Sequence, residues 1–103
     1  MKYSKLVRDK IPEIIKAKGQ VPIIHYASEE EYWKRLREKL TEEVDEFLKD
    51  ENTEELADIL EVIDSICDFK KFDKKSLYEL KEKKKFKRGG FSKKIILEEI
   101  KDE

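Results

Sequence analysis

The chain has 103 residues, of which 48% are charged and 38% are hydrophobic. This length allows one domain with one modest core, and no apolar run approaches the roughly 20 residues of a membrane-spanning helix. The single cysteine, Cys67, excludes an intrachain disulfide and a cysteine-based zinc site. The N-terminus also lacks the apolar core of a signal peptide, so we expect a cytoplasmic protein. From the length we expect one domain over residues 1–103.

Charge is unevenly distributed along the chain, although the formal net charge is only −1. Residues 28–64 hold fifteen acids and five bases, whereas residues 70–94 hold twelve bases and three acids. One half is therefore suited to binding cations and the other to binding phosphates. Plain charge mixing in a lysine- and glutamate-rich protein explains the same pattern. Composition alone leaves both interpretations open.

The first half of the chain carries signals for two helices. Residues 7–19 predict a short helix, with Pro12 in its first turn and Gly19 at its end. Residues 21–27, with the sequence VPIIHYA, are β-branched and aromatic and predict a short extended segment. Ser28 followed by Glu31 predicts a capping box that opens a long helix to about residue 49.

Two further helices follow. Asn52 or Thr53 is expected to cap a helix to about residue 69, and another runs from about residue 74 to the glycine pair 89–90, where we expect a left-handed cap. The tail KKIILEEI fits a strand or a helical turn, and we favour a strand that pairs with residues 21–27. The predicted fold class is all-α, a small helical bundle around an antiparallel helix hairpin with a minor two-stranded β element.

Four carboxylates lie beside the apolar faces of the two central helices. On helical wheels, Glu43 and Glu46 border the apolar stripe of the first, Glu55 lies inside that of the second, and Asp58 borders it. In an antiparallel hairpin centred between residues 50 and 51, Glu46 would lie opposite Glu55, and Glu43 opposite Asp58. Carboxylates this close repel unless protons or cations intervene, and Mg²⁺ and Mn²⁺ prefer oxygen ligands.

This face and register predict a metal site. The alternative is a hairpin whose acids all face solvent, because such spacings are common in a chain with 25 acids. The remaining acids of the hairpin are assigned no chemical role: Asp45, Asp50, Glu51 and Glu54.

The acidic strings EEVDE and EELAD resemble the E-E-x-x-E … E-x-x-D signature of the all-alpha NTP pyrophosphatase superfamily, which includes MazG-like proteins, dimeric dUTPases and phosphoribosyl-ATP pyrophosphatases. The opening YSKLVRDKIPEII and the late KRGGF resemble a small branch of predicted house-cleaning enzymes, so the resemblance covers nearly the whole chain. Eight residues separate Glu46 from Glu55, fewer than the family usually has. Using Glu61 and Asp64 as the second half would restore the spacing, but both face away from the core.

The resemblance implies Mg²⁺-dependent hydrolysis of a nucleoside triphosphate to a monophosphate and pyrophosphate, with non-standard nucleotides as substrates. It makes Glu43, Glu46, Glu55 and Asp58 the metal ligands, with Mn²⁺ as the other candidate metal. Glu43 is then also a catalytic residue, and Glu42 is an outer ligand or candidate base. Members of the superfamily commonly associate, so we expect a homodimer or higher homo-oligomer in which a second subunit completes a four-helix bundle and the pocket.

Cations and aromatic rings complete the expected site. Lys39, one turn from Glu43, is the nearest candidate for binding phosphate, although surface solvation is the favoured explanation for any single cation. Tyr32 and Trp33 are candidates for stacking on a base, with core packing favoured for Trp33. His25 is expected to be structural and Cys67 a core residue. The further phosphate-binding candidates are Arg8, Lys10, Lys87 and Arg88.

Two other classes of function compete with the enzyme. The basic stretch KEKKKFKRGG suits contacts with a nucleic-acid backbone. The near-neutral net charge and the acidic half argue against nucleic acid as a partner. The remaining alternative is a structural helical adaptor without catalysis.

Overall fold

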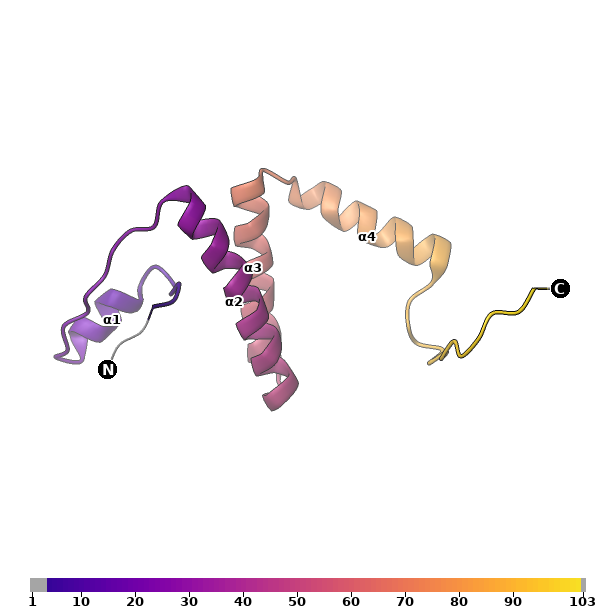
Figure 1. Ribbon diagram of the computed structural model, residues 1–103, viewed down its shortest axis with the longest axis horizontal. Helices are drawn as coiled ribbons and strands as arrows, with labels where there is room; N and C mark the ends of the chain where they lie inside the picture. Colours follow the sequence, from indigo (N-terminus) through magenta and orange to yellow (C-terminus); the bar gives the residue numbers. More distant parts are fainter. Residues whose placement is uncertain (1–3, 103) are drawn as a thin grey trace. The chain divides into compact units, whose positions relative to one another are not determined.

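The computed structural model describes residues 4–102 (Figure 1). In this range the chain forms helices and no strand, which confirms the all-α fold class. It divides into two compact units between Lys71 and Phe72. The single domain over residues 1–103 stays a prediction, and residues 1–3 and 103 lie outside the described range. The helices are α1 (Ile11–Ala17), α2 (Glu29–Asp50), α3 (Thr53–Lys70) and α4 (Lys74–Arg88).

The short helix α1 lies within the predicted range of residues 7–19, but it begins four residues later than predicted, at Ile11, and ends at Ala17, two residues before Gly19. Pro12 lies in its first turn, where a proline costs no hydrogen bond because the first amides of a helix have no partner within it. Gly19 follows the helix with a φ of 82°, a conformation that side chains disfavour, and its N–H donates to the carbonyl of Lys16. The chain then turns into the extended segment of residues 20–27.

The long helix α2 begins at a side-chain cap. Ser28 Oγ accepts a hydrogen bond from the Glu31 N–H at 3.2 Å, which confirms Ser28 as the N-cap. In a capping box the Glu31 carboxylate would accept from the Ser28 N–H. Here it contacts His25 instead, with Glu31 Oε1 2.9 Å from His25 Nε2. His25 thus anchors the preceding segment to the first turn of α2, in agreement with its expected structural role.

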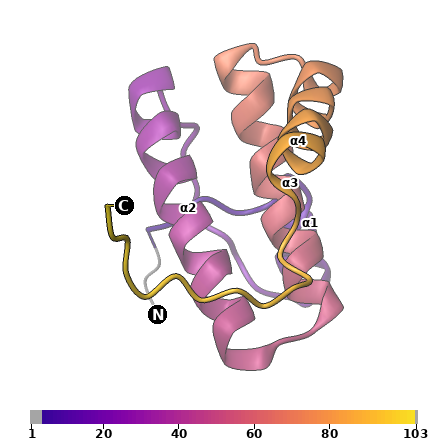
Figure 2. The ribbon, with the colours of Figure 1, turned by 90° about the vertical axis from the view of Figure 1, so that its right-hand side faces the viewer.

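A tight turn joins α2 to α3. Glu51 ends α2 in the left-handed region, with φ 48° and ψ 42°, and its N–H donates to the carbonyl of Phe47 at 2.7 Å. Asn52 then caps α3 by accepting from the Glu55 N–H at 3.0 Å. With only two residues between them, the helices must run antiparallel, and they lie side by side in both views (Figure 1, Figure 2).

The core of this hairpin is small. Leu36, Val62 and Cys67 are its buried apolar residues among those described, and burial of the free Cys67 confirms it as a core residue. At one end of the hairpin, Trp33 stacks on Phe69 with ring centroids 5.6 Å apart. Because so few side chains are buried, other apolar side chains of both helices stay exposed to solvent.

Helix α4 belongs to the second unit and contains no buried residue. Asp73 caps it by accepting from both the N–H and the hydroxyl of Ser76. Gly89 ends it with φ 83° and ψ 173°, so the expected left-handed cap is wrong in detail. The φ is positive, but the ψ is that of extended chain, a combination that essentially only glycine adopts.

The predicted two-stranded β element is absent from the described residues. Residues 21–27 are extended but unpaired, and residues 95–102 form neither strand nor helix. Two isolated strands are stable only when one face is buried, and here Ile23 is 97% exposed and Ile96 82% exposed. The preference for a strand in the tail was therefore wrong. Among the described helices, none has the length and apolar character that crossing a membrane requires.

Candidate metal centre on the helix hairpin

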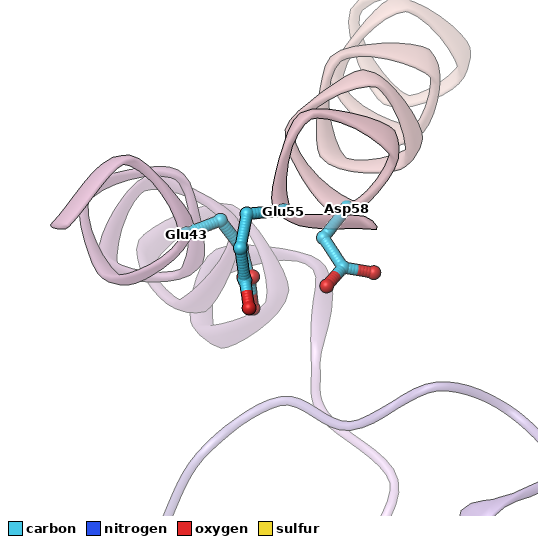
Figure 3. A group of neighbouring side chains, drawn as sticks. All are labelled: Glu43, Glu55 and Asp58. Carbon is cyan, nitrogen blue, oxygen red and sulfur yellow. The ribbon is translucent and has the colours of Figure 1, made fainter. Parts of the chain in front are cut away.

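Three carboxylates from the two central helices converge on one side of the hairpin (Figure 3). Glu43 projects from α2, and Glu55 and Asp58 project from α3, one turn apart. One oxygen from each can be chosen so that all three lie within 4.8 Å of one another. The sequence predicted that these side chains would meet across the helix–helix contact, and the hairpin brings them together.

A second group of carboxylates shares Glu55 with the first. Glu46, Asp50 and Glu55 also offer oxygens within 4.8 Å of one another. All four predicted ligands are thus brought together, in two groups that overlap at Glu55. Asp50, which the sequence analysis set aside, belongs to the second group. The signal for it was its position seven residues after Glu43, which places the two at nearly the same angle on the helix.

Glu43 is the most enclosed member of the cluster, with 8% of its surface exposed. Its carboxylate is balanced by Lys39, whose Nζ lies 3.2 Å from Glu43 Oε1 one turn earlier on α2. A buried carboxylate needs such a partner, because removing its charge from water is costly. Lys39 therefore lies where it was expected, directly beside the candidate site.

Glu55 has the least balanced charge in the cluster. Partial burial raises the pKa of its carboxyl, and the negative charges of Asp58, Glu46, Asp50 and Glu43 raise this pKa further. Each of these causes disfavours the ionised form. A divalent cation among these oxygens would act in the opposite direction on Glu55, by stabilising its carboxylate.

Glu42 lies outside both groups and has a different environment. Burial alone would raise the pKa of Glu42, but the hydrogen bond from Lys5 and the charges of Lys39 and Lys5 outweigh it, so the pKa is lowered. Lys5 Nζ donates to Glu42 Oε1 at 3.0 Å, and Lys39 Nζ lies 3.4 Å from Oε2. A carboxylate held by two cations is a weak base, so these contacts favour a positioning role for Glu42 over that of general base.

The N-terminal segment brings a second cation to the cluster. Arg8 Nη2 donates to Asp58 Oδ1 at 2.7 Å, fifty residues away in the sequence. Together with the Lys5–Glu42 contact, this places residues 5–8 across the carboxylate side of the hairpin. Arg8 was predicted as a phosphate-binding residue, and it lies within reach of any group bound at Asp58.

The other predicted site residues lie elsewhere. Lys10 is exposed beside the start of α1, and Lys87 and Arg88 end α4 in the second unit. The two base-stacking candidates are ten residues or more before Glu43 on α2, about 15 Å along the helix. Tyr32 meets Phe69 edge-on at 5.4 Å, and the Trp33 ring contacts both the Phe69 ring and the Lys70 ammonium. These aromatic contacts connect α2 and α3 at the end of the hairpin that lies away from the carboxylates.

The alternative second half of the motif does not join the cluster. Glu61 is exposed and Asp64 is half-buried, and neither belongs to a group of close carboxylates among the described residues. The short spacing, through Glu55 and Asp58, is therefore the one that brings carboxylates of both helices together.

Comparisons with known proteins give one partial match. The chain is 54% identical over 43 residues to an uncharacterized protein of Mycolicibacterium smegmatis. This segment covers 42% of the chain and 44% of that protein, so less than half of either is matched. No family model and no solved structure matches the chain. Its function is therefore inferred from its own residues and their geometry.

Proposed function

We propose that this chain is a Mg²⁺-dependent nucleoside triphosphate pyrophosphohydrolase that removes non-standard nucleotides. The observation that carries the proposal is the convergence of Glu43, Glu55 and Asp58 from both helices of the hairpin within 4.8 Å. The resemblance to the all-alpha NTP pyrophosphatase superfamily, on the strings EEVDE and EELAD, supplies the reaction.

The donor set fits a hard divalent cation. Both groups in the hairpin consist only of carboxylates, the ligands that Mg²⁺ and Mn²⁺ favour over zinc, which takes nitrogen and sulfur. The pKa of Glu55 is raised first by partial burial and then by the negative charges of its neighbours, and a cation bound there would offset both effects. Glu43, Glu55 and Asp58 would hold a metal, and Glu46 and Asp50, which group with Glu55, are further carboxylates available to it.

A bound Mg²⁺ would neutralise phosphate charge and make a water more acidic. The chain's own residues account for the rest of the proposed site. Lys39 and Arg8 contact the carboxylates directly, so both can donate hydrogen bonds to phosphate oxygens near them. Glu42 restrains Lys5 and Lys39, and through Lys39 it helps to fix the charge beside Glu43.

A second copy of the chain is part of the proposal. Four exposed apolar side chains on α2 and α3 lie, on helical wheels, about 100–140° away from Glu43 and Glu55. Burying such a face against another hairpin would complete a four-helix bundle and leave the carboxylate side accessible to a nucleotide. These side chains are Val44, Leu48, Leu56 and Leu60.

Release of pyrophosphate from a panel of standard and damaged nucleoside triphosphates tests the proposal. With Mg²⁺ present, we expect pyrophosphate and a monophosphate from at least one substrate, and no activity in excess chelator. Replacement Glu43→Gln keeps the size of the side chain and should reduce the rate at least about a hundredfold. Asp45→Asn, on the exposed side of α2, removes the same charge and should retain the rate.

Orthophosphate as the first product, or full activity in chelator, would contradict the proposal. So would equal losses in Glu43→Gln and Asp45→Asn, because that result would show that overall charge matters and not the cluster.

A further inference from the structure

The second unit carries a concentration of positive charge that the proposed reaction does not use. Eight of the fifteen residues of α4 are lysine or arginine and two are glutamate. In its second half, four of these cations fall within an arc of about 100° around the helix, with no acid among them. We call this set the basic stripe: Lys81, Lys84, Lys85 and Arg88.

The basic stripe faces solvent, and its cations follow one another along the helix at steps of three, one and three residues. All four residues are exposed, and Lys81 forms an ion pair with Glu82 at 3.1 Å. From Lys81 to Lys85 the rise is about 6 Å, and from Lys85 to Arg88 about 4.5 Å. Cations repeated at such intervals can contact successive phosphates of one nucleic-acid strand.

An exposed aromatic ring follows the stripe directly. Phe91, after the glycine pair that ends α4, is 98% exposed. It begins a turn in which the Lys94 N–H donates to the Phe91 carbonyl at 3.1 Å, so Lys93 and Lys94 lie beside it. A solvent-exposed ring among cations is the combination that proteins use to stack on unpaired bases. Because the Phe91 ring is almost fully exposed, it is not part of the hydrophobic core.

We propose that the basic stripe and Phe91 form a surface that binds single-stranded nucleic acid. The net charge that disfavours a nucleic-acid partner is that of the whole chain. The structure divides the chain at Lys71 and Phe72, and the basic stripe belongs entirely to the second unit, whereas the acidic hairpin belongs to the first. The site is distinct from the carboxylate cluster and does not depend on the proposed hydrolysis.

An anionic membrane would also attract these cations, but the distribution of apolar residues disfavours it. A helix that lies in a membrane surface needs one continuous apolar face. On α4 the exposed Leu77, Leu80 and Phe86 point in directions spread over about 180°. Nucleic acid requires only the stripe and a ring, and both are present.

Fluorescence anisotropy with a labelled oligothymidylate of about 20 nucleotides tests this inference on the full-length chain. We expect binding that weakens with salt, with a slope that Lys84→Gln/Lys85→Gln lowers by about one to one and a half. The control Lys75→Gln/Lys83→Gln removes equal charge outside the arc on the same helix and should change the slope less than half as much. Glutamine favours helix, so circular dichroism should show α4 intact in both variants.

The aromatic contact is tested by Phe91→Ala. It should weaken binding about five- to a hundredfold with no change in the salt slope, whereas Phe86→Ala, an equally exposed ring on the other side of α4, should have little effect. Three results would overturn the inference: no binding at low salt, equal effects of the paired variants, or stripe-dependent binding to anionic vesicles without binding to the oligonucleotide.

Discussion

Glu55 has the least favourable surroundings of the ionisable groups in the hairpin. Its carboxylate is half-buried and lies among four other acids, and these effects raise its pKa. A raised pKa means that the folded chain holds this proton more tightly than the unfolded chain does. The folded state is therefore destabilised by Glu55 as pH rises from the ordinary value of 4.5 through the raised pKa.

A substitution that removes this charge should stabilise the hairpin at neutral pH. In chelator, Glu55→Gln is expected to raise the melting temperature at pH 7, and the gain should vanish below pH 4.5, where Glu55 is protonated in both states. Glu54→Gln, in the same first turn of α3 but outside the cluster, controls for the helix dipole and should lower the melting temperature slightly. A gain at pH 7 that persists unchanged at pH 3 would contradict this explanation.

Single residues also mark the limit of sequence reasoning at the candidate site. Helical wheels placed Glu43, Glu46, Glu55 and Asp58 on one side because side-chain direction in a helix follows position along the chain. Asp50 was missed because it was assigned to the turn, whereas α2 continues through it. The contact of Arg8 with Asp58 spans fifty residues, and no local rule predicts which of 24 cations makes it.

At the scale of elements, both ends of the central hairpin depend on residues in the left-handed region. Glu51 ends α2 with φ 48° and Lys71 ends α3 with φ 60°. Non-glycine residues adopt this conformation at a cost, because the Cβ atom crowds the following carbonyl. Glu51 therefore forms the turn between α2 and α3 at a conformational cost.

Relief of that crowding should stabilise the hairpin. Glu51→Gly is expected to raise the free energy of unfolding by about 1 kcal/mol, measured by urea denaturation, because glycine adopts positive φ without a Cβ clash. Glu51→Ala removes the same charge but keeps the Cβ atom, so its gain should be much smaller. Equal gains in the two variants would assign the effect to charge instead.

Elements were predictable where local chemistry decides them. Ser28, Asn52 and the glycines at 19 and 89 fixed the helix ends to within a residue or two, because caps act on their own turn. The β element failed for the opposite reason. Composition favoured strands at residues 21–27 and in the tail, but a strand needs a partner and a buried face, and neither is coded locally.

At the scale of the whole molecule, the apolar side chains on one side of the hairpin are exposed to water, which is energetically unfavourable. Leu48 and Leu60 are 66% and 53% exposed on adjacent helices. Exposed apolar patches are typical of interaction sites, and in the proposed assembly a second hairpin would bury these side chains. A sequence pattern can identify an apolar helix face, but it does not identify what covers that face. The expectation of a homo-oligomer therefore rested on the family resemblance.

Light scattering tests the assembly. We expect a mass of about twice the chain's 12.4 kDa, and Leu48→Glu/Leu60→Glu should yield monomers, because burying two added carboxylates in an interface is costly. Val21→Glu places a charge at an apolar position outside the hairpin that is 86% exposed, and it should leave the mass unchanged. A monomeric wild-type chain at micromolar concentration would contradict the proposed bundle.

Binding of Mn²⁺, followed by electron paramagnetic resonance, tests most directly the proposal that carboxylates of both helices hold a divalent cation. The wild-type chain should bind Mn²⁺, Mg²⁺ should displace it, and Glu43→Gln should weaken binding at least about tenfold while Asp45→Asn does not. Binding that is absent, or that weakens equally in the two variants, would show that the cluster is a charged surface and not a metal centre.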